Sequence, residues 1–155
     1  MLRLSKKMRY ALEAVVDIAY NAQAEPVQSK DITRRQGIPQ RYLEQVMQRL
    51  VRAGILKGVR GPRGGYHLAR ERRRITVGEI VRVVAEMETD GNARESNGET
   101  GGQSVLGDTV VGPLLDDLKA EMMDRLDAVT VQDLCNRAKS AGVVRESRRD
   151  LDFTI

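Results

Sequence analysis

Arginine and glycine alternate in a short segment, residues 58–65, whose chemistry suits contact with a polyanion. Its two arginines, Arg60 and Arg63, lie among the turn-forming residues Gly58, Gly61, Pro62, Gly64 and Gly65. Two short apolar runs, residues 55–56 and 66–68, flank the segment and predict a β-hairpin with a small cationic tip. Glycine lets a backbone approach a nucleic-acid groove closely, and arginine supplies positive charge. We therefore expect Arg60, Arg63 and Gly64 to contact DNA.

A second group of polar side chains recurs at helical spacing just before the hairpin, in residues 40–53. Arginine can bond guanine, glutamine can bond adenine, and glutamate can accept from cytosine in the major groove. An ordinary solvated helix face has a similar composition, but the position between a turn and a cationic hairpin favours DNA reading. With Lys30 from the preceding helix, the predicted contacts are Gln40, Arg41, Glu44, Gln45, Gln48, Arg49 and Arg52.

Three helices must position these side chains. Apolar periodicity predicts the first helix over residues 6–22. Ser29 can cap the second helix, which Gly37 ends, and a tight Gly-Ile-Pro turn leads into the third helix. Two helices joined by a short turn that contains glycine are typical of a helix-turn-helix unit.

The second half of the chain predicts three more elements and a loop. Thr76 with Glu79, and Thr130 with Asp133, form capping-box patterns for helices over residues 77–87 and 130–139. Residues 89–107 are polar and glycine-rich, which is typical of a flexible loop. Residues 113–129, between the loop and the last helix, have an apolar stripe. Two copies of the chain could bury this stripe in a homodimer, or the helix could fold back on its own domain. The predicted dimerisation residues are Leu114, Leu115, Leu118, Met122 and Leu126.

Charge divides the 155 residues into two unlike halves. Residues 1–75 contain 17 Lys and Arg and 6 Asp and Glu, whereas residues 76–155 contain 9 and 16. The basic half suits a polyanionic partner. We expect a DNA-binding domain over residues 1–75, a connecting helix over 76–88, a loop over 89–107, a dimerisation helix with a short following helix over 108–141, and a tail over 142–155.

Composition also argues against several classes of protein. Glu13 and Asp17 interrupt the first apolar stretch, so we expect no signal peptide, and no apolar run has the ~18 residues that a membrane span needs. A single cysteine cannot form an internal disulfide, so a cytoplasmic protein is expected. No phosphate-binding loop, metal-ligand cluster or nucleophile–base pair is present, which argues against an enzyme.

Several segments together resemble one known family. They read KMRYALEAVVDIA, GIPQRYLEQVMQRLVRAGIL, VRGPRGGYHLAR, ITVGEIVRVV and VTVQDL, and they cover most of the chain. The chain resembles the small winged-helix bacterial transcription regulators that include the iron–sulfur regulator IscR, the nitric-oxide sensor NsrR and the cysteine-metabolism repressor CymR. The resemblance implies a mainly α fold with a small β-hairpin, comprising a winged helix-turn-helix DNA-binding domain and a long C-terminal dimerisation helix. It also implies a homodimeric repressor on a double-stranded, pseudo-palindromic operator, with residues 40–52 in major grooves and residues 60–65 in minor grooves.

The chain departs from the family where cluster-binding members carry three loop cysteines. Asn92, Gly98 and Ser104 stand at about those spacings, and none is a good iron ligand. We therefore expect no cofactor and no conventional iron–sulfur site, while an atypical cluster with one cysteine and acidic ligands stays open. Cys135, within an apolar pattern, is expected to be a small buried residue, and His67 is expected to be structural.

The chain ends on an apolar and acidic sequence with a free Ile155 carboxylate. The cysteine-metabolism branch also lacks loop cysteines and resembles this chain in its short apolar tail, and cysteine synthase relays its signal. Phe153 and Ile155 are therefore candidate contacts for cysteine synthase. The same resemblance implies a role in the regulation of cysteine or sulfur metabolism. The alternative is that the terminus has no such role. A second alternative for the whole chain is a winged-helix adaptor that binds protein instead of DNA.

Overall fold

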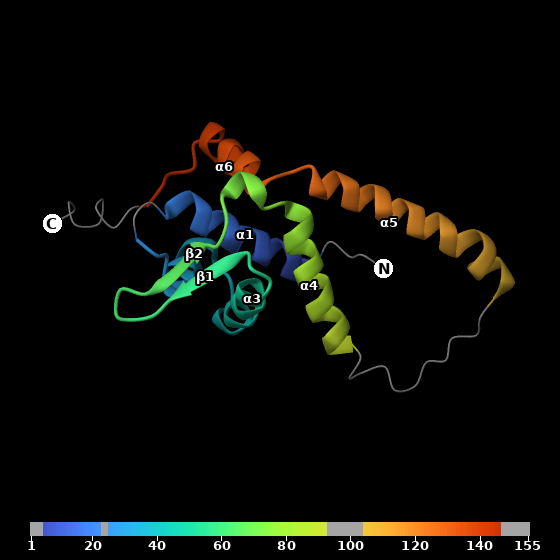
Figure 1. Ribbon diagram of the computed structural model, residues 1–155, viewed down its shortest axis with the longest axis horizontal. Coiled ribbons are helices and arrows are strands. Elements are labelled where there is room, and N and C mark those ends of the chain that lie inside the picture. The colour runs from blue at the N-terminus through green and yellow to red at the C-terminus, as the bar shows by residue number, and fades with distance from the viewer. Residues whose placement is uncertain (1–4, 23–24, 93–103, 147–155) are drawn as a thin grey trace.

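The computed structural model describes residues 5–22, 25–92 and 104–146. Helices dominate these ranges, and a two-stranded antiparallel sheet is placed between the third and fourth helices (Figure 1). The elements are α1 (Lys6–Asn21), α2 (Ser29–Gln36), α3 (Gln40–Arg52), β1 (Leu56–Val59), β2 (Gly65–Leu68), a 3₁₀ turn (Arg72–Arg74), α4 (Val77–Asn92), a π-helical turn (Gly107–Val111), α5 (Gly112–Asp127) and α6 (Val131–Ser140). The mainly α fold with a small hairpin is confirmed.

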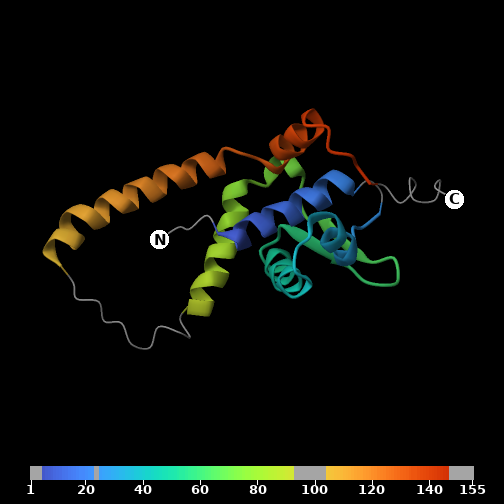
Figure 2. The same cartoon turned by 180° about the vertical axis from the view of Figure 1, so that it is seen from behind.

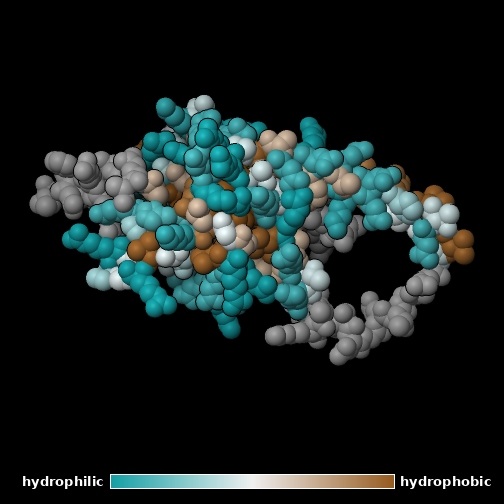
Figure 3. Space-filling model, viewed as in Figure 1, coloured by the Kyte–Doolittle hydropathy of each residue, from teal (hydrophilic) through white to brown (hydrophobic). Residues whose placement is uncertain are grey.

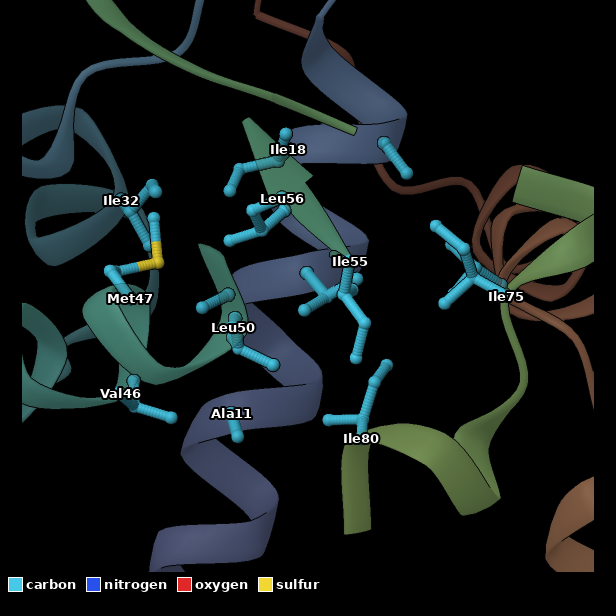
Figure 4. Close-up of a cluster of buried hydrophobic side chains, with 14 of the residues drawn as sticks. Ala11, Ile18, Ile32, Val46, Met47, Leu50, Ile55, Leu56, Ile75 and Ile80 are labelled. Atoms are coloured by element: carbon cyan, nitrogen blue, oxygen red, sulfur yellow. The ribbon is translucent and has the colours of Figure 1, made fainter. Parts of the chain in front are cut away.

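The hydrophobic core surrounds α1, which packs against α2, α3, α4, α6 and β2. Figure 4 shows side chains from α1, α2, α3, β1 and α4 converging on this centre. Isoleucine, valine, leucine and methionine fill it, as the near absence of aromatic residues requires. The labelled members, all at most 2% exposed, are Ala11, Ile18, Ile32, Val46, Met47, Leu50, Ile55, Leu56, Ile75 and Ile80.

Residues in and next to the turn determine where α2 ends and α3 begins in the helix-turn-helix unit. Gly37 follows α2 with φ 66° and ψ 26°, a left-handed conformation that glycine adopts without strain. Ile38 is 1% exposed and anchors the turn, and Pro39 precedes the first residue of α3. Ser29 is the first helical residue of α2, so the cap position falls on Gln28, whose side chain makes no capping bond.

The hairpin is tied to the rest of the domain through Tyr66. Its N–H donates to the carbonyl of Val27 at 2.8 Å, and the N–H of Val27 donates to the carbonyl of Tyr66 at 3.0 Å. This pairing extends the β1–β2 ladder to the connection between α1 and α2. The hairpin is therefore held close to its turn, at the Gly58–Tyr66 pair, while the turn itself projects beyond the core (Figure 1).

Helix α4 begins at the predicted capping box and continues further than expected. Thr76 Oγ1 accepts from the Glu79 N–H at 3.1 Å, and Glu79 accepts from the Thr76 N–H at 3.3 Å. The sequence predicted an end near Met87, but the helix runs to Asn92. Contacts outside the helix stabilise these last turns, including a 2.8 Å hydrogen bond from Ser5 to Glu88.

Helical structure also resumes earlier than predicted, at residue 105 instead of 113. Ser104 explains the difference, because its Oγ accepts from the Gly107 N–H at 2.8 Å in the manner of a helix cap. The expected loop over residues 89–107 therefore has helix at both ends. Helix α5 extends away from the core in both views (Figures 1 and 2).

Helix α6 returns the chain to α1. Its predicted capping box is present, with Thr130 and Asp133 each accepting from the other's N–H. These hydrogen bonds lower the pKa of the Asp133 carboxyl. The Val131 N–H donates to the Ile75 carbonyl at 2.9 Å, and Cys135 is only 2% exposed against α1. The expectation of a buried cysteine is confirmed.

Candidate nucleic-acid interface

Helix α3 has one buried face and one exposed face. Leu43, Val46, Met47 and Leu50 are all 0% exposed and attach the helix to the core. The opposite face presents most of the predicted reading residues, which are Gln40, Arg41, Glu44, Gln45, Gln48 and Arg52, and all are exposed. Six of the seven predicted contacts on this helix thus lie on one accessible polar face.

The start of α3 is held by polar contacts on both sides. Thr33 of α2 donates to Gln40 Oε1 at 2.9 Å, and Gln40 Nε2 donates to Glu44 Oε1 at 3.1 Å. Tyr42 donates to the Lys7 carbonyl at 2.9 Å. Burial, together with the negative charge of Glu88, raises the pKa of Tyr42 to about 12, so its hydroxyl stays protonated at neutral pH. These bonds orient the reading face relative to α1 and α2.

Arg49, the seventh predicted contact on α3, has a different environment. It is half-buried, and its guanidinium donates to Asp90 at 2.9 Å. Asp90 lies in the part of α4 that the sequence did not predict to be helical. Arg49 is therefore ion-paired within its own chain. It lies beside Gln45, Gln48 and Arg52.

The hairpin tip carries both predicted arginines at the surface. Arg60 and Arg63 are exposed, and the turn between them is compact. A Cβ on Gly64 would clash with the carbonyl oxygen of Val59 and lie 2.8 Å from that of Gly61. Gly64 is thus required by the turn itself, whatever its role toward a ligand.

A concavity of about 550 Å³ separates the hairpin from the first turn of α2. Lys30 and Ser29 line one side of it, and Arg60 and Gly64 line the other. Gln28 spans it with a 3.5 Å hydrogen bond to the Pro62 carbonyl. The start of a helix has N–H groups without partners inside the helix, so this end of α2 suits an anion such as phosphate. Sequence reasoning placed Lys30 here but missed Gln28 and Ser29, which only the fold brings to the hairpin.

Other arginines after the hairpin are engaged by the protein. Arg70 pairs with Glu79 at 3.0 Å, and Arg73 pairs with Glu71 at 2.6 Å. Arg72 donates to the Ala19 carbonyl at 3.4 Å. This connector therefore stabilises the fold, and the exposed cations at the hairpin tip are the better candidates for ligand contact.

The predicted dimerisation residues fall into two groups. Leu114, Leu115 and Leu118 are 56%, 45% and 52% exposed, an unusual state for three leucines on one helix. Met122 is half-buried, and Leu126 packs against the core of its own chain. The first half of α5 thus leaves an apolar face uncovered, which Figure 3 shows as brown surface toward the free end of the helix.

The described residues do not fit an iron–sulfur cluster. They contain no group of three or more His, Cys, Asp and Glu side chains that could hold a metal ion. Cys135 is the only cysteine of the sequence and is enclosed by the core. His67 is half-buried on β2 opposite Lys57. Within the described part of the chain, no helix is long and apolar enough to cross a bilayer.

A helix-turn-helix unit followed by a two-stranded wing, with exposed polar and cationic side chains on both, defines a winged-helix DNA-binding protein. The model of the Rrf2 family, described as iron-dependent transcriptional regulators, matches residues 4–137. The chain belongs to the Rrf2 family and is a DNA-binding transcriptional regulator.

Individual relatives agree with this assignment. The HTH-type transcriptional regulator IscR of Escherichia coli is 38% identical over 135 residues, which are 87% of this chain and 81% of that protein. The structure of IscR from T. potens has a TM-score of 0.70 and 33% identity, and the match covers 94% of each chain. The structure of CymR, the global cysteine regulator of B. subtilis, has a TM-score of 0.64 and 31% identity over 88% of this chain and 98% of that one.

Proposed function

We propose that this regulator is a cytoplasmic homodimeric repressor that reads a two-fold operator with α3 and the hairpin. One α3 would enter each major groove, and Arg60 and Arg63 would enter the adjacent minor groove. The observations that carry the proposal are the exposed polar face of α3 and the concavity that Ser29 and Lys30 of α2 line together with Arg60 of the hairpin. Phosphate contacts there would set the register, and the side chains of α3 would read bases.

The dimer is supported by α5. Its three exposed leucines have no cover within the described chain, and a second copy related by two-fold symmetry would bury the same patch twice. Dimeric readers place their two recognition helices about one DNA turn apart, ~34 Å, and their two-fold symmetry makes the operator a palindrome.

A winged-helix adaptor that binds protein is the second candidate. It would use the acidic second half of the chain and would not need two exposed arginines on a glycine-rich tip. The exposure of Arg60 and Arg63 therefore favours DNA over this alternative. Catalysis has no support, because the described residues provide no cluster of reactive side chains beside the concavity.

A role in cysteine or sulfur metabolism is supported by similarity to CymR alone. The candidate contacts for cysteine synthase, Phe153 and Ile155, lie outside the described residues. Pull-down of cysteine synthase with the full chain and with a chain ending at residue 151 tests this part. Equal recovery by both would contradict it.

The wing assignment is tested by replacing Arg60 and Arg63 together with alanine. We expect binding to a duplex selected from a random pool to weaken by about 1–3 kcal/mol for each arginine that contacts a base. The control is Arg73→Ala, which removes one surface cation that already pairs with Glu71. Unchanged gel-shift affinity in the double variant would show that the hairpin does not contact DNA.

A further inference from the structure

A cluster of ion pairs lies at the end of α2 that is remote from the wing. Its centre is Asp17 of α1, which is 3% exposed and is the buried charged residue of the described chain. Arg35 donates to both of its carboxylate oxygens, at 2.7 and 2.8 Å, and Gln36 donates at 2.8 Å. A bidentate, charge-assisted pair fixes both distance and angle. The last turn of α2 is therefore locked to α1.

Glu146 adds a second carboxylate to the same turn from the other end of the sequence. Arg34 donates to its two oxygens at 2.7 and 3.2 Å, and Arg35 donates to it at 3.1 Å. The hydrogen bonds from Arg34 and then Arg35 lower the pKa of Glu146 to about 2, so this carboxylate is charged at neutral pH. Glu146 thus bridges two adjacent arginines that would otherwise repel each other.

Three more contacts fix residues 143–146, which we call the C-terminal clasp. Tyr20 donates its hydroxyl proton to the Val143 carbonyl at 2.6 Å, and the Arg145 guanidinium lies 4.7 Å from the centre of the Tyr20 ring. The Glu146 N–H donates to Asn21 Oδ1 at 2.8 Å. The clasp is therefore bound to the end of α1 as well as to α2.

Helix α2 connects the clasp to the DNA side of the molecule. The helix has eight residues and is about 12 Å long, so its two ends move together. Its first turn, with Ser29 and Lys30, lines the concavity beside the wing, and its last turn is held by Glu146. A displacement of the last turn is transmitted directly to the first.

We propose that Glu146 is a positioning residue for DNA binding, which holds α2 in place through Arg34 and Arg35 although it lies outside the DNA-binding domain. This inference rests on the proposed contact between α2 and DNA. It also identifies a route for regulation, because a partner that binds or displaces residues 143–146 would change DNA affinity without touching the DNA-contacting surface.

The test compares Glu146→Gln with Glu71→Gln in the full-length chain. Both variants lose one negative charge, so the net charge of the chain changes equally. Glu71 pairs with Arg73 in the exposed connector and takes no part in the clasp. The Glu146→Gln variant should fold, because Arg35 keeps its pair with Asp17, and circular dichroism checks this.

We expect the Glu146→Gln variant to bind a duplex selected with the wild-type chain about threefold to tenfold more weakly than the Glu71→Gln variant. Affinity for a scrambled duplex should be equal in the two. Amide hydrogen exchange in α2 should be faster in the Glu146→Gln variant alone. Tyr20→Phe, which removes the bond to Val143, should act in the same direction and be less than additive with Glu146→Gln.

Equal affinities of the two glutamine variants for the selected duplex would overturn the inference, even if exchange in α2 differed, since Glu146 would then be structural only. Failure of the wild-type chain to select any duplex would count against the proposed function instead. In that case unchanged exchange in α2 would separately overturn the role of Glu146 in holding the helix.

Discussion

Helices α3 and α5 are both amphipathic, yet only α3 has its apolar face buried in the core. Leu43 and Leu50 of α3 are 0% exposed, whereas Leu114 and Leu118 of α5 are 56% and 52% exposed. Within α5, all of whose residues are described, no side chain is buried. The apolar face of α3 is thus covered within one chain, while α5 exposes the apolar surface that the proposed dimer would bury.

The charges follow the same division. The basic half of the sequence contains α3 and the wing, and the acidic half contains α5. A dimer built through α5 would therefore keep its acidic helices apart from DNA and present its basic surfaces to it. If α3 and α5 differ in this way, variants of the two helices should differ in their effects on assembly and on folding stability.

The largest effect is expected from Leu118→Asp, which places a charge within the exposed apolar face of α5. Burying a carboxylate in an apolar interface is strongly unfavourable, so the variant should be monomeric. A monomer engages one half-site, and loss of avidity should weaken operator binding by roughly 10²–10⁴-fold. Light scattering after size-exclusion chromatography measures the mass, and fluorescence anisotropy measures the affinity.

The control for this variant lies on the other side of the same helix. Ala120 is exposed and lies about 165° of helical rotation from the mean direction of the exposed leucines, taking ~100° for each residue. Ala120→Asp adds the same charge at nearly the same height. If both variants were monomeric, helix stability or charge, and not the leucine face, would explain the result.

A second prediction compares leucines of the two helices in the folding of a single chain. Leu50→Ala should lower the free energy of unfolding by about 2–5 kcal/mol, because it leaves a cavity in a filled core. Leu115→Ala should change it by less than about 1 kcal/mol, because this side chain is already 45% exposed. Urea unfolding at protein concentrations too low for dimerisation measures both values. Similar losses would mean that α5 belongs to the core of its own chain.

Sequence reasoning succeeded where the determining signals are local. Both capping boxes, the left-handed Gly37 and the two-faced pattern of α3 depend on residues three or four positions apart, and the structure has all of them. The hairpin and the helix-turn-helix unit follow from the same kind of signal. For this reason the helix-turn-helix unit and the hairpin could be predicted as elements, while the contacts of their side chains with DNA stay a prediction.

The predictions were weaker where contacts join distant parts of the sequence. Two hydrogen bonds stabilise the last turns of α4. Ser5 and Glu88 are 83 positions apart in the sequence, and Arg49 and Asp90 are 41 positions apart. The clasp joins Glu146 to α2 across more than 100 positions. No periodicity in the sequence reveals such pairs. The start of α5 is different, because Ser104 was a readable capping residue that the glycine-rich composition around it obscured.

The smallest effect is expected from Asp90→Asn, which tests the ion pair between α4 and Arg49, a predicted reading residue of α3. Arg49 and Asp90 are 38% and 63% exposed, so their ion pair contributes at most about 1 kcal/mol. Freed from Asp90, Arg49 can reach a phosphate beside Gln48 and Arg52. We expect DNA affinity to rise about twofold to fivefold, and the dependence of log affinity on log salt to steepen by up to about one.

Two further variants separate release of Arg49 from a general change in charge. Glu86→Gln removes an exposed acid from α4 without involving Arg49, and it should raise affinity less than Asp90→Asn does. In the Arg49→Ala background, Asp90→Asn should have no more effect than Glu86→Gln, since the cation it would release is absent. If Asp90→Asn instead gave the same gain with and without Arg49, the gain would come from the lost negative charge and not from release of Arg49. If the gain requires Arg49, the acidic half already restrains one reading residue before DNA is bound.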